Sequence, residues 1–380
     1  MENNANNIYS IDYSNVLGKG SFGTVYKGKM NKNNKEQIVA LKTIPQEIIN
    51  DKNKLQMLSN EVLISANLFE DENNNNNNDG IDRKKNVVAF LDITQIDNKD
   101  YLVYEFCNGG DLNRYLKYFR NFDEKMIQNL LRQILTGLNL LHEKKIVHHD
   151  IKPPNILVEI HLPEGDDSDL EETIKDIMEM TSSNFKRNTN PNNKMTKERL
   201  LTILSNSDMK LSDFGLSKEM KNYNKKEVGG SPLYIDPILF DKKSNVEDIH
   251  NEKVDIWAIG IIAYEMFFNT LPFSPFPPNI QFLKLLLEKG QYKIDLKKRQ
   301  KISKQFLSFL NMCLQRPQKI RPLTDELLLS EFFTKEPESF DYITIDNYKS
   351  IEFPDDSYLK NEGQITMNID DNRMINAIFE

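Results

Sequence analysis

The chain has 380 residues, of which 39% are hydrophobic and 28% charged, enough for about two domains with buried cores. Its formal net charge of -8 argues against a protein that binds nucleic acid or an anionic membrane through a basic surface. No run approaches the ~20 apolar residues of a membrane span, so no integral membrane segment is expected. Residues 1–10 lack the basic start and apolar core of a signal peptide.

The two cysteines, Cys107 and Cys313, lie in apolar sequence without the spacing of metal ligands. Two free thiols are typical of a reducing compartment. We therefore expect an intracellular, cytoplasmic protein without a disulfide.

Residues 9–30 alternate apolar and polar side chains around glycines, which predicts a strand, a tight turn and a second strand. Gly18, Gly20 and Gly23 fit the pattern G-x-G-x-x-G, with Val25 after them. Glycines let backbone N–H groups approach phosphates because no Cβ intervenes. Alone, the pattern fits an ordinary hairpin better. It is not a dinucleotide fingerprint, because the chain continues as a strand where that motif requires a helix.

The next predicted strand, residues 38–42, ends in Lys42. Such a lysine either extends along a sheet edge into solvent or holds the α- and β-phosphates of a nucleotide. The second role needs a carboxylate partner, and Glu61 lies in the middle of the helix predicted over residues 51–70. We favour the second role, because the glycine loop lies at a suitable distance upstream.

The middle of the chain changes pattern several times. Residues 70–86 are of low complexity and predict a disordered insertion. Residues 87–96 and 100–106 predict an antiparallel pair of strands, and residues 107–111 a hinge. Two helical segments are predicted next, over 112–119 and over the apolar periodicity of 123–145.

Residues 146–157, IVHHDIKPPNIL, carry the most chemistry. They place Asp150, Lys152 and Asn155 in one short turn, and the sequence Asp213-Phe214-Gly215 follows about sixty residues later. An acid that orients a hydroxyl, a cation for a transferring phosphoryl group and two oxygen ligands for Mg²⁺ are what protein-kinase chemistry requires.

Residues 160–207 separate two strands that a hairpin would ordinarily join. The segment is mostly polar and predicts two amphipathic helices, over about 169–181 and 195–205. A surface loop absorbs such an insertion at modest entropic cost. We expect a tolerated excursion, with a dedicated docking module as the alternative.

The last third of the chain is mainly helical by pattern. Residues 255–268 begin D-I-W-A-I-G and predict a buried helix, and residues 280–333 predict further helices, the last opened by Arg321 and Pro322. From Lys335 the sequence is acidic with little periodicity, so residues 335–380 are expected to form an appendage.

In this order the landmarks resemble the eukaryotic protein kinase family over residues 9–334. Lys152 resembles the serine/threonine branch, and the stretches CNGGDLNRYL and GGSPLYIDP are similar to the autophagy-initiating (ULK) group. The resemblance implies an α+β, two-lobed fold. It has a small N-terminal lobe (about 9–106) with an antiparallel sheet and one helix, a hinge (107–111) and a larger, mainly helical C-terminal lobe (112–334).

The resemblance also implies ATP and Mg²⁺ as cofactors and assigns residue roles. Asp150 would orient the substrate hydroxyl and accept its proton, Lys152 would neutralise charge on the γ-phosphate, and Asn155 and Asp213 would hold Mg²⁺. The predicted nucleotide-binding positions are the glycine loop (Gly18, Gly20, Gly23), Lys42 fixed by Glu61, the apolar contacts to adenine (Leu17, Val25, Ala40, Leu157), the hinge backbone (Glu105, Cys107) with Tyr104 behind it, and Asp111 at the ribose.

The sequence departs from the family at two motifs. The H-R-D motif has His149 in place of arginine, the residue that would clamp a phosphorylated activation loop, so this is a non-RD kinase by motif. We therefore expect activity to depend little on a phosphate within residues 216–230. The A-P-E motif reads Asp236-Pro237-Ile238, which removes the glutamate that pairs with Arg321. Either Asp236 or another acid replaces it, or Arg321 is partly solvated.

A third departure lies one helical turn after Glu61, where Ser65 stands in place of a large apolar side chain. A weaker contact there suggests an inactive resting state that a regulatory partner protein corrects.

The favoured function is a serine/threonine kinase that transfers the γ-phosphate of ATP to a protein hydroxyl. The alternative is a catalytically weak pseudokinase scaffold that docks partners through its insertions. Lys42, Asp150, Asn155 and Asp213 are all present, which favours activity. A small-molecule kinase is disfavoured by D-x-W-x-x-G and by GGSPLY. In that stretch Ser231 would bond Asp150 and Lys152 and help select a hydroxyl substrate, unless it is a plain turn serine.

Overall fold

The computed structural model describes residues 8–20, 23–69, 83–182, 195–220, 230–240, 251–274, 293–294, 301–315 and 318–344. The chain divides into two compact units. Unit 1 comprises Met1–Tyr118, Thr136–Lys144 and Pro153–Ser217, and unit 2 comprises Phe119–Leu135, Lys145–Lys152 and Lys218–Glu380. The helix α4 (Glu124–Glu143) contributes residues to both.

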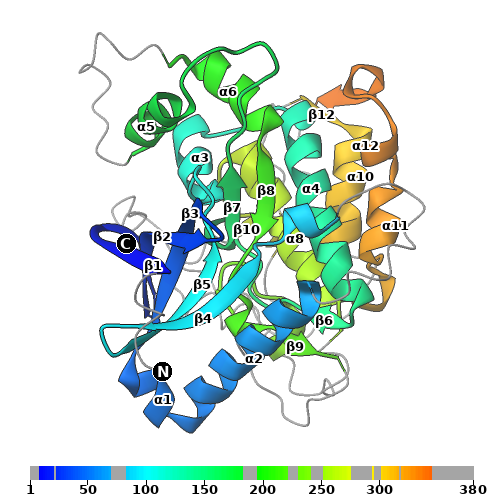
Figure 1. Ribbon diagram of the computed structural model, residues 1–380. Helices are drawn as coiled ribbons and strands as arrows, with labels where there is room; N and C mark the ends of the chain where they lie inside the picture. The colour runs from blue at the N-terminus through cyan, green and yellow to red at the C-terminus, as the bar shows by residue number, and fades with distance from the viewer. Residues whose placement is uncertain are drawn as a thin grey trace, which may run out of the picture. The chain divides into compact units, whose positions relative to one another are not determined.

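Unit 1 contains a five-stranded antiparallel sheet in the order β1-β2-β3-β5-β4 (Figure 1). One face of the sheet closes over a small apolar core that includes Val39, Leu41, Tyr101 and Val103. Because side chains alternate along a strand, the residues between them point to the opposite face. The strands are β1 (Tyr9–Gly20), β2 (Gly23–Lys32), β3 (Lys35–Ile44), β4 (Phe90–Ile96) and β5 (Lys99–Glu105).

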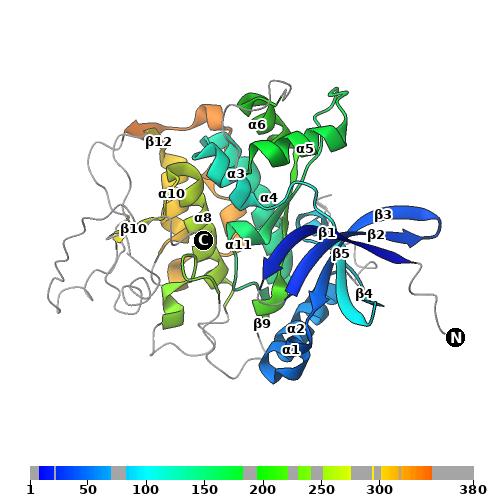
Figure 2. The same cartoon turned by 90° about the vertical axis from the view of Figure 1, so that its left-hand side faces the viewer.

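Two helices follow β3. The predicted helix is present as α2 (Lys52–Phe69), and it buries Glu61, Ile64, Ser65 and Leu68. It is preceded by α1 (Gln46–Asn50), which leads directly into it (Figure 2). The sequence did not indicate α1, because this helix is too short to show a helical periodicity.

The low-complexity insertion ends earlier than predicted. Residues 83–86 form a 3-10 helix, η2 (Arg83–Asn86), and Asn86 is only 1% exposed. Its side-chain amide donates to the Met209 carbonyl at 2.9 Å. The buried amide is satisfied by a strand far along the chain, which composition does not reveal. Residues 70–82 lie outside the described residues, so the predicted disorder there stays a prediction.

Residues 107–111, the predicted hinge, are bonded to the strand that follows residues 146–155. The helix α3 (Leu112–Phe119) comes next, as predicted. Gly109 N–H donates to the Val158 carbonyl, and Val158 N–H donates to the Gly110 carbonyl, both at 2.8 Å. Unit 1 includes Pro153–Ser217, beyond the predicted N-terminal lobe (about 9–106), and these bonds connect that segment to Met1–Tyr118. The two bonds join the predicted hinge to β7 (Ile156–Glu159). The strand β7 pairs with β8 (Asp208–Leu211). The 3-10 helix η3 (Pro153–Asn155) precedes β7, and η4 (Phe214–Leu216) follows β8.

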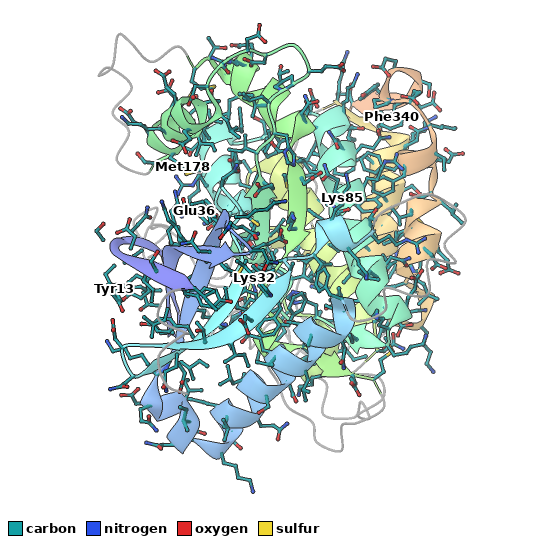
Figure 3. All side chains as sticks on the ribbon, viewed as in Figure 1. Tyr13, Lys32, Glu36, Lys85, Met178 and Phe340 are labelled. Atoms are coloured by element: carbon teal, nitrogen blue, oxygen red, sulfur yellow. The ribbon has the colours of Figure 1, made fainter. Side chains whose placement is uncertain are left out.

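Both helices predicted within the insertion are present, as α5 (Leu170–Met180) and α6 (Lys197–Asn206). Arg114 of α3 donates to the Met178 carbonyl at 3.3 Å and to Thr181 Oγ1 at 3.4 Å. Met178, labelled in Figure 3, lies on α5. The C-terminal end of α5 therefore contacts α3, while residues 183–194 lie outside the described residues.

Unit 2 is built around α8 (Lys253–Phe268), whose side chains are almost all buried. The helix α10 (Lys304–Cys313) packs against α8 (Figures 1 and 2), and α12 (Glu331–Thr334) packs against α10, with α11 (Thr324–Leu328) next to α12. In the described part of the chain, no helix combines the length and the apolar character needed to cross a bilayer. The shorter elements are β6 (Ile146–Val147), β9 (Lys218–Glu219), η5 (Pro237–Phe240), β10 (Phe273–Ser274), β11 (Lys293–Ile294), η6 (Gln318–Ile320) and η7 (Pro337–Ser339).

The start of the acidic tail is part of unit 2. The strand β13 (Tyr342–Thr344) pairs antiparallel with β12 (Lys301–Ser303), a strand where only helices were predicted. Lys304 N–H donates to the Asp341 carbonyl at 2.8 Å. Phe340, labelled in Figure 3, is buried. The expectation of an appendage from Lys335 onward was therefore wrong up to residue 344, and residues 345–380 lie outside the described residues.

Asp236 supplies the carboxylate that the A-P-E motif lacks. Both of its oxygens accept from the guanidinium of Arg321, a residue only 1% exposed. Arg321 Nε also donates to the Gln315 carbonyl at 2.6 Å, and the guanidinium lies 5.1 Å from the Trp257 ring centroid. The sequence left open whether Asp236 or another acid replaces the glutamate, or whether Arg321 is partly solvated. In the structure Asp236 replaces it, and Arg321 is buried.

We predict that Asp236→Asn lowers the free energy of unfolding by about 3–5 kcal/mol, because it leaves a buried guanidinium without its counter-charge. Urea unfolding of the wild type and the variant measures this difference. Asp325→Asn, at an exposed position of α11, is the control and should change the value by no more than about 0.5 kcal/mol. Equal urea midpoints for Asp236→Asn and the wild type would contradict the assignment.

Candidate functional site

A buried ion pair joins β3 to α2. Lys42 Nζ lies 2.7 Å from Glu61 Oε1 and 3.7 Å from Asp213 Oδ1. The Glu61 side chain is 3% exposed and that of Lys42 is 13% exposed. Burial alone would lower the pKa of Lys42, but the Glu61 and Asp213 carboxylates outweigh it and raise that pKa above its ordinary value. Lys42 is therefore a charged ammonium held between two acids.

Tyr104 shares the same carboxylate oxygen. Its hydroxyl donates to Glu61 Oε1 at 2.8 Å, and its ring meets the Phe90 ring edge-on at 5.6 Å. Burial and the nearby Glu61 raise the pKa of Tyr104 well above its ordinary value, so the phenol is a neutral donor at neutral pH. The sequence placed Tyr104 behind the adenine but gave no sign of this bond, because donor and acceptor lie 43 residues apart.

Ser65 is fully buried on α2, and its hydroxyl has no hydrogen-bond partner in the described part of the chain. A large apolar side chain at this position would contribute about 1.5–3 kcal/mol of burial. Ser65 contributes almost none of it, yet the Lys42–Glu61 pair is formed. The structure therefore has α2 in the paired arrangement, and the inactive resting state predicted from the serine stays a prediction.

Ser212, which lies between β8 and Asp213, bonds the chain before Asp213 to Asn155. Ser212 donates to the Asn155 carbonyl twice, from its N–H at 2.9 Å and from its hydroxyl at 3.0 Å. Asp213 has a left-handed backbone (φ 66°), and its side chain is 40% exposed. A carboxylate and an amide oxygen fit Mg²⁺, which prefers oxygen ligands and keeps several waters. Among the described residues there is no group of three or more His, Cys, Asp and Glu arranged for a metal.

The predicted adenine contacts also fall within unit 1. Strand pairing sets Val25 opposite Lys42 and Ala40 opposite Tyr104, and a single bridge sets Leu157 opposite Asp111. The three apolar side chains are only partly buried, so part of their surface is open to a ligand. Leu17, on the glycine-rich turn, is 41% exposed.

The three glycines of the predicted phosphate-binding turn, Gly18, Gly20 and Gly23, differ in whether the surrounding structure leaves room for a side chain. At Gly23 the backbone is left-handed (φ 136°), and a Cβ would lie 2.3 Å from the Thr43 carbonyl oxygen. At Gly18 and Gly20 a Cβ would meet nothing within 4 Å. Of these three glycines, only Gly23 is required by packing, and the other two leave room for a close approach by a ligand.

At the predicted hinge, the side chains of Glu105 and Cys107 are hydrogen-bonded or buried, so their backbone groups are the ones left to contact a nucleotide. Glu105 accepts from Ala89 N–H through Oε1 and from Lys210 Nζ through Oε2, both at 2.7 Å. Cys107 is a free thiol, 8% exposed, and burial raises its pKa, so it is not nucleophilic. Burial also raises the pKa of Asp111, against the lowering effect of Arg114, whose N–H it accepts at 3.1 Å.

In unit 2 the catalytic-loop residues form a compact polar group. Asp150 accepts from Ser231 N–H through Oδ1 at 2.9 Å and lies 2.7 Å from Lys152 Nζ through Oδ2. Lys152 Nζ donates to Ser231 Oγ at 2.7 Å. The contacts predicted for Ser231 are thus present, and its role as a plain turn serine is not supported. Asp150 and Ser231 line a small hollow that continues to Tyr234 and Asp255.

Asp255 fixes the backbone of this loop, a role the sequence did not reveal. It is 1% exposed, and its two oxygens accept from His148 N–H at 2.8 Å and from His149 N–H at 2.9 Å. His149 has a left-handed backbone (φ 65°), which costs a non-glycine residue about 1–2 kcal/mol. The two bonds help to hold that conformation. The feature of the sequence that could have indicated this role is the carboxylate in the first turn of a mostly apolar helix.

We predict that Ser65→Ala leaves the free energy of unfolding unchanged or raises it by up to about 1 kcal/mol, because it removes a buried hydroxyl without a partner. Ser303→Ala is the matched contrast. That hydroxyl is also fully buried, but it donates to Glu124 and accepts from Phe306 N–H. Its loss should cost about 1–3 kcal/mol. Urea unfolding checks both values, and an equal loss in the two variants would show that Ser65 has a partner.

Comparison with known proteins gives a family match over most of the chain. The model of the protein kinase domain matches residues 11–333. Human serine/threonine-protein kinase ULK1 is 28% identical over 333 residues, which is 87% of this chain and 26% of that protein. Mouse serine/threonine-protein kinase ULK3 is 28% identical over 259 residues, 68% of this chain and 41% of that protein. Mouse Aurora kinase C is 25% identical over 267 residues, 70% of this chain and 73% of that protein.

These relatives differ in how much of their length is matched. The chain spans about a quarter of ULK1 and about two-fifths of ULK3. The likeness to both therefore concerns a part of each protein.

Proposed function

The chain belongs to the protein kinase family, and we propose that it is an active serine/threonine kinase that transfers the γ-phosphate of ATP to a protein hydroxyl with Mg²⁺. The observation that carries the proposal is the buried Lys42–Glu61 pair with Asp213 beside it. A charged lysine fixed in this way is ready to hold phosphates without a further rearrangement. The resemblance to ULK and Aurora kinases supports the choice of serine and threonine as acceptors.

In the proposed reaction the residues of unit 1 hold the nucleotide. Lys42 contacts the α- and β-phosphates, and the apolar surfaces of Val25, Ala40 and Leu157 contact the adenine. Asn155 and Asp213 would hold Mg²⁺, which would supply positive charge to neutralise the triphosphate. The triphosphate is thereby fixed in one orientation, which removes much of the entropic barrier to transfer.

The residues of unit 2 act on the acceptor. Asp150 orients the substrate hydroxyl and takes its proton as the new oxygen–phosphorus bond forms and the bond to ADP breaks. Its two oxygens contact Ser231 N–H and Lys152 Nζ, and these contacts fix the orientation of the carboxylate toward the acceptor. Lys152 places a positive charge for the phosphoryl group in transfer.

The pseudokinase scaffold remains the second candidate, and the insertion between β7 and β8 is the feature that favours it. Against it stand Lys42, Asp150, Asn155 and Asp213, because a chain that only binds partners has no need of all four. The regulatory partner expected from Ser65, and the identity of the protein substrate, stay predictions.

We predict that Asp150→Asn and Asp213→Asn each lower phosphate transfer from labelled ATP to a generic protein substrate by at least about a hundredfold. The two losses have different causes. Asp150→Asn removes the proton acceptor and should leave ATP binding nearly intact, whereas Asp213→Asn removes a ligand of Mg²⁺. Measuring ATP affinity with and without Mg²⁺ separates them.

The control for both variants is Asp97→Asn, at an exposed turn between β4 and β5. It makes the same chemical change away from the proposed residues, and it should leave transfer within about twofold of the wild type. A wild-type protein that binds ATP and Mg²⁺ but transfers no phosphate would favour the scaffold instead.

We also predict that activity does not require a phosphate on the activation loop. Residues 216–230 contain only two hydroxyl side chains, Ser217 and Tyr223, and Ser217 is 1% exposed. His149 replaces the arginine that would clamp a phosphate by a bidentate pair. The double variant Ser217→Ala/Tyr223→Phe should therefore transfer phosphate within about tenfold of the wild type, equal to about 1.4 kcal/mol.

Steady-state rates measured on both proteins decide this point. Tyr223→Phe alone is the companion variant, because it leaves the buried serine in place. A loss well above tenfold in the single variant would show that a modified Tyr223 takes part in activation.

A further inference from the structure

We infer that Tyr104 is a positioning residue, whose hydroxyl holds Glu61 of α2 in the place where the helix lacks an apolar contact at Ser65. The catalytic part of this inference rests on the proposed kinase function. Its structural part, the attachment of α2, does not.

The geometry singles out one carboxylate oxygen. Glu61 Oε1 accepts from Lys42 Nζ at 2.7 Å and from Tyr104 Oη at 2.8 Å. Strand pairing sets Ala40 opposite Tyr104, so both donors stand on one face of the sheet, two positions apart in register. Glu61 is thus held from two neighbouring strands, and the phenol fixes the carboxylate at the distance that the lysine needs.

The rest of α2 shows why a second donor matters at this point. The C-terminal end of the helix is tied by Lys144, whose Nζ donates to the Asn67 carbonyl at 3.0 Å. At the middle, the buried positions are Glu61, Ile64 and Ser65, and only Ile64 is apolar. The Ser65 hydroxyl has no partner in the described residues. Besides the packing of α2 against η4 (Phe214–Leu216), the middle of the helix is therefore held by the polar contacts of Glu61.

The role of the Tyr104 hydroxyl can be tested without losing the packing of the ring. Its ring packs edge-on against Phe90, and phenylalanine would keep that contact. Tyr101 offers a matched control on the same strand. It is fully buried, but it lies on the opposite face, within the apolar core, and its hydroxyl lies 3.4 Å from that of Tyr13.

The experiment compares Tyr104→Phe, Tyr101→Phe and the wild type by two readouts. The first is kcat/KM for ATP, and the second is hydrogen exchange of the amides of residues 55–68. Tyr104→Phe should lower kcat/KM by about tenfold and speed exchange in this segment. Tyr101→Phe should do neither. Unchanged kinetics and unchanged exchange in Tyr104→Phe would overturn the inference.

A double-mutant cycle separates positioning from a general effect on the fold. In a Glu61→Ala background the hydroxyl has nothing to hold, so adding Tyr104→Phe should cause no further loss of kcat/KM. The same tenfold loss in that background would overturn the inference, because Tyr104 would then act through another group.

The proposed function and the role of Tyr104 can be contradicted by different results. If the wild type transfers no phosphate, the proposed function falls, and exchange of residues 55–68 still tests the attachment of α2. If the wild type is active and Tyr104→Phe matches it in both readouts, only the role of Tyr104 is lost.

Discussion

The buried contact between Lys42 and Glu61 is the constraint on which the rest of unit 1 depends. An ammonium removed from water is costly unless a carboxylate meets it at close range, and here the carboxylate comes from a helix outside the sheet. The pair can form only if β3 has its present register and α2 lies against the face that carries Ala40, Lys42 and Tyr104. Asp213 adds a second acid at 3.7 Å, which ties the start of η4 to the same charge. A lysine held in this way favours an anionic ligand, and the oxygen donors of Asn155 and Asp213 suit the metal that accompanies a triphosphate.

Much of this could be predicted from the sequence, because the relevant signals are local. Alternation around glycines indicated β1 and β2, helical spacing indicated α2 and α4, and the order of short motifs indicated the family. What could not be predicted depends on contacts between distant segments. Asn86 lies in polar sequence that gives no sign of the bond from its amide to the Met209 carbonyl, and β13 is too short to be recognised without its partner β12.

The sites where the chain departs from its family show the same limit. The missing glutamate of A-P-E was evident, but only the structure shows that Asp236 takes up the charge of Arg321. The missing apolar residue at position 65 was equally evident, and it suggested an inactive resting state. We infer that a phenol on a neighbouring strand compensates for it, because its hydroxyl reaches Glu61. At A-P-E, and by this inference at position 65, a side chain from a different position fills the gap in the motif, and the motif itself gives no sign of it.

The most direct test of the account is the energetic coupling of Lys42 and Glu61 in the transfer reaction. The measurement is kcat/KM for ATP in Lys42→Met, Glu61→Gln and the double variant. If Glu61 acts by holding Lys42, the double variant should lose hardly more than the Lys42 variant alone. Losses that simply multiply would mean that the two residues act independently, and would contradict the account.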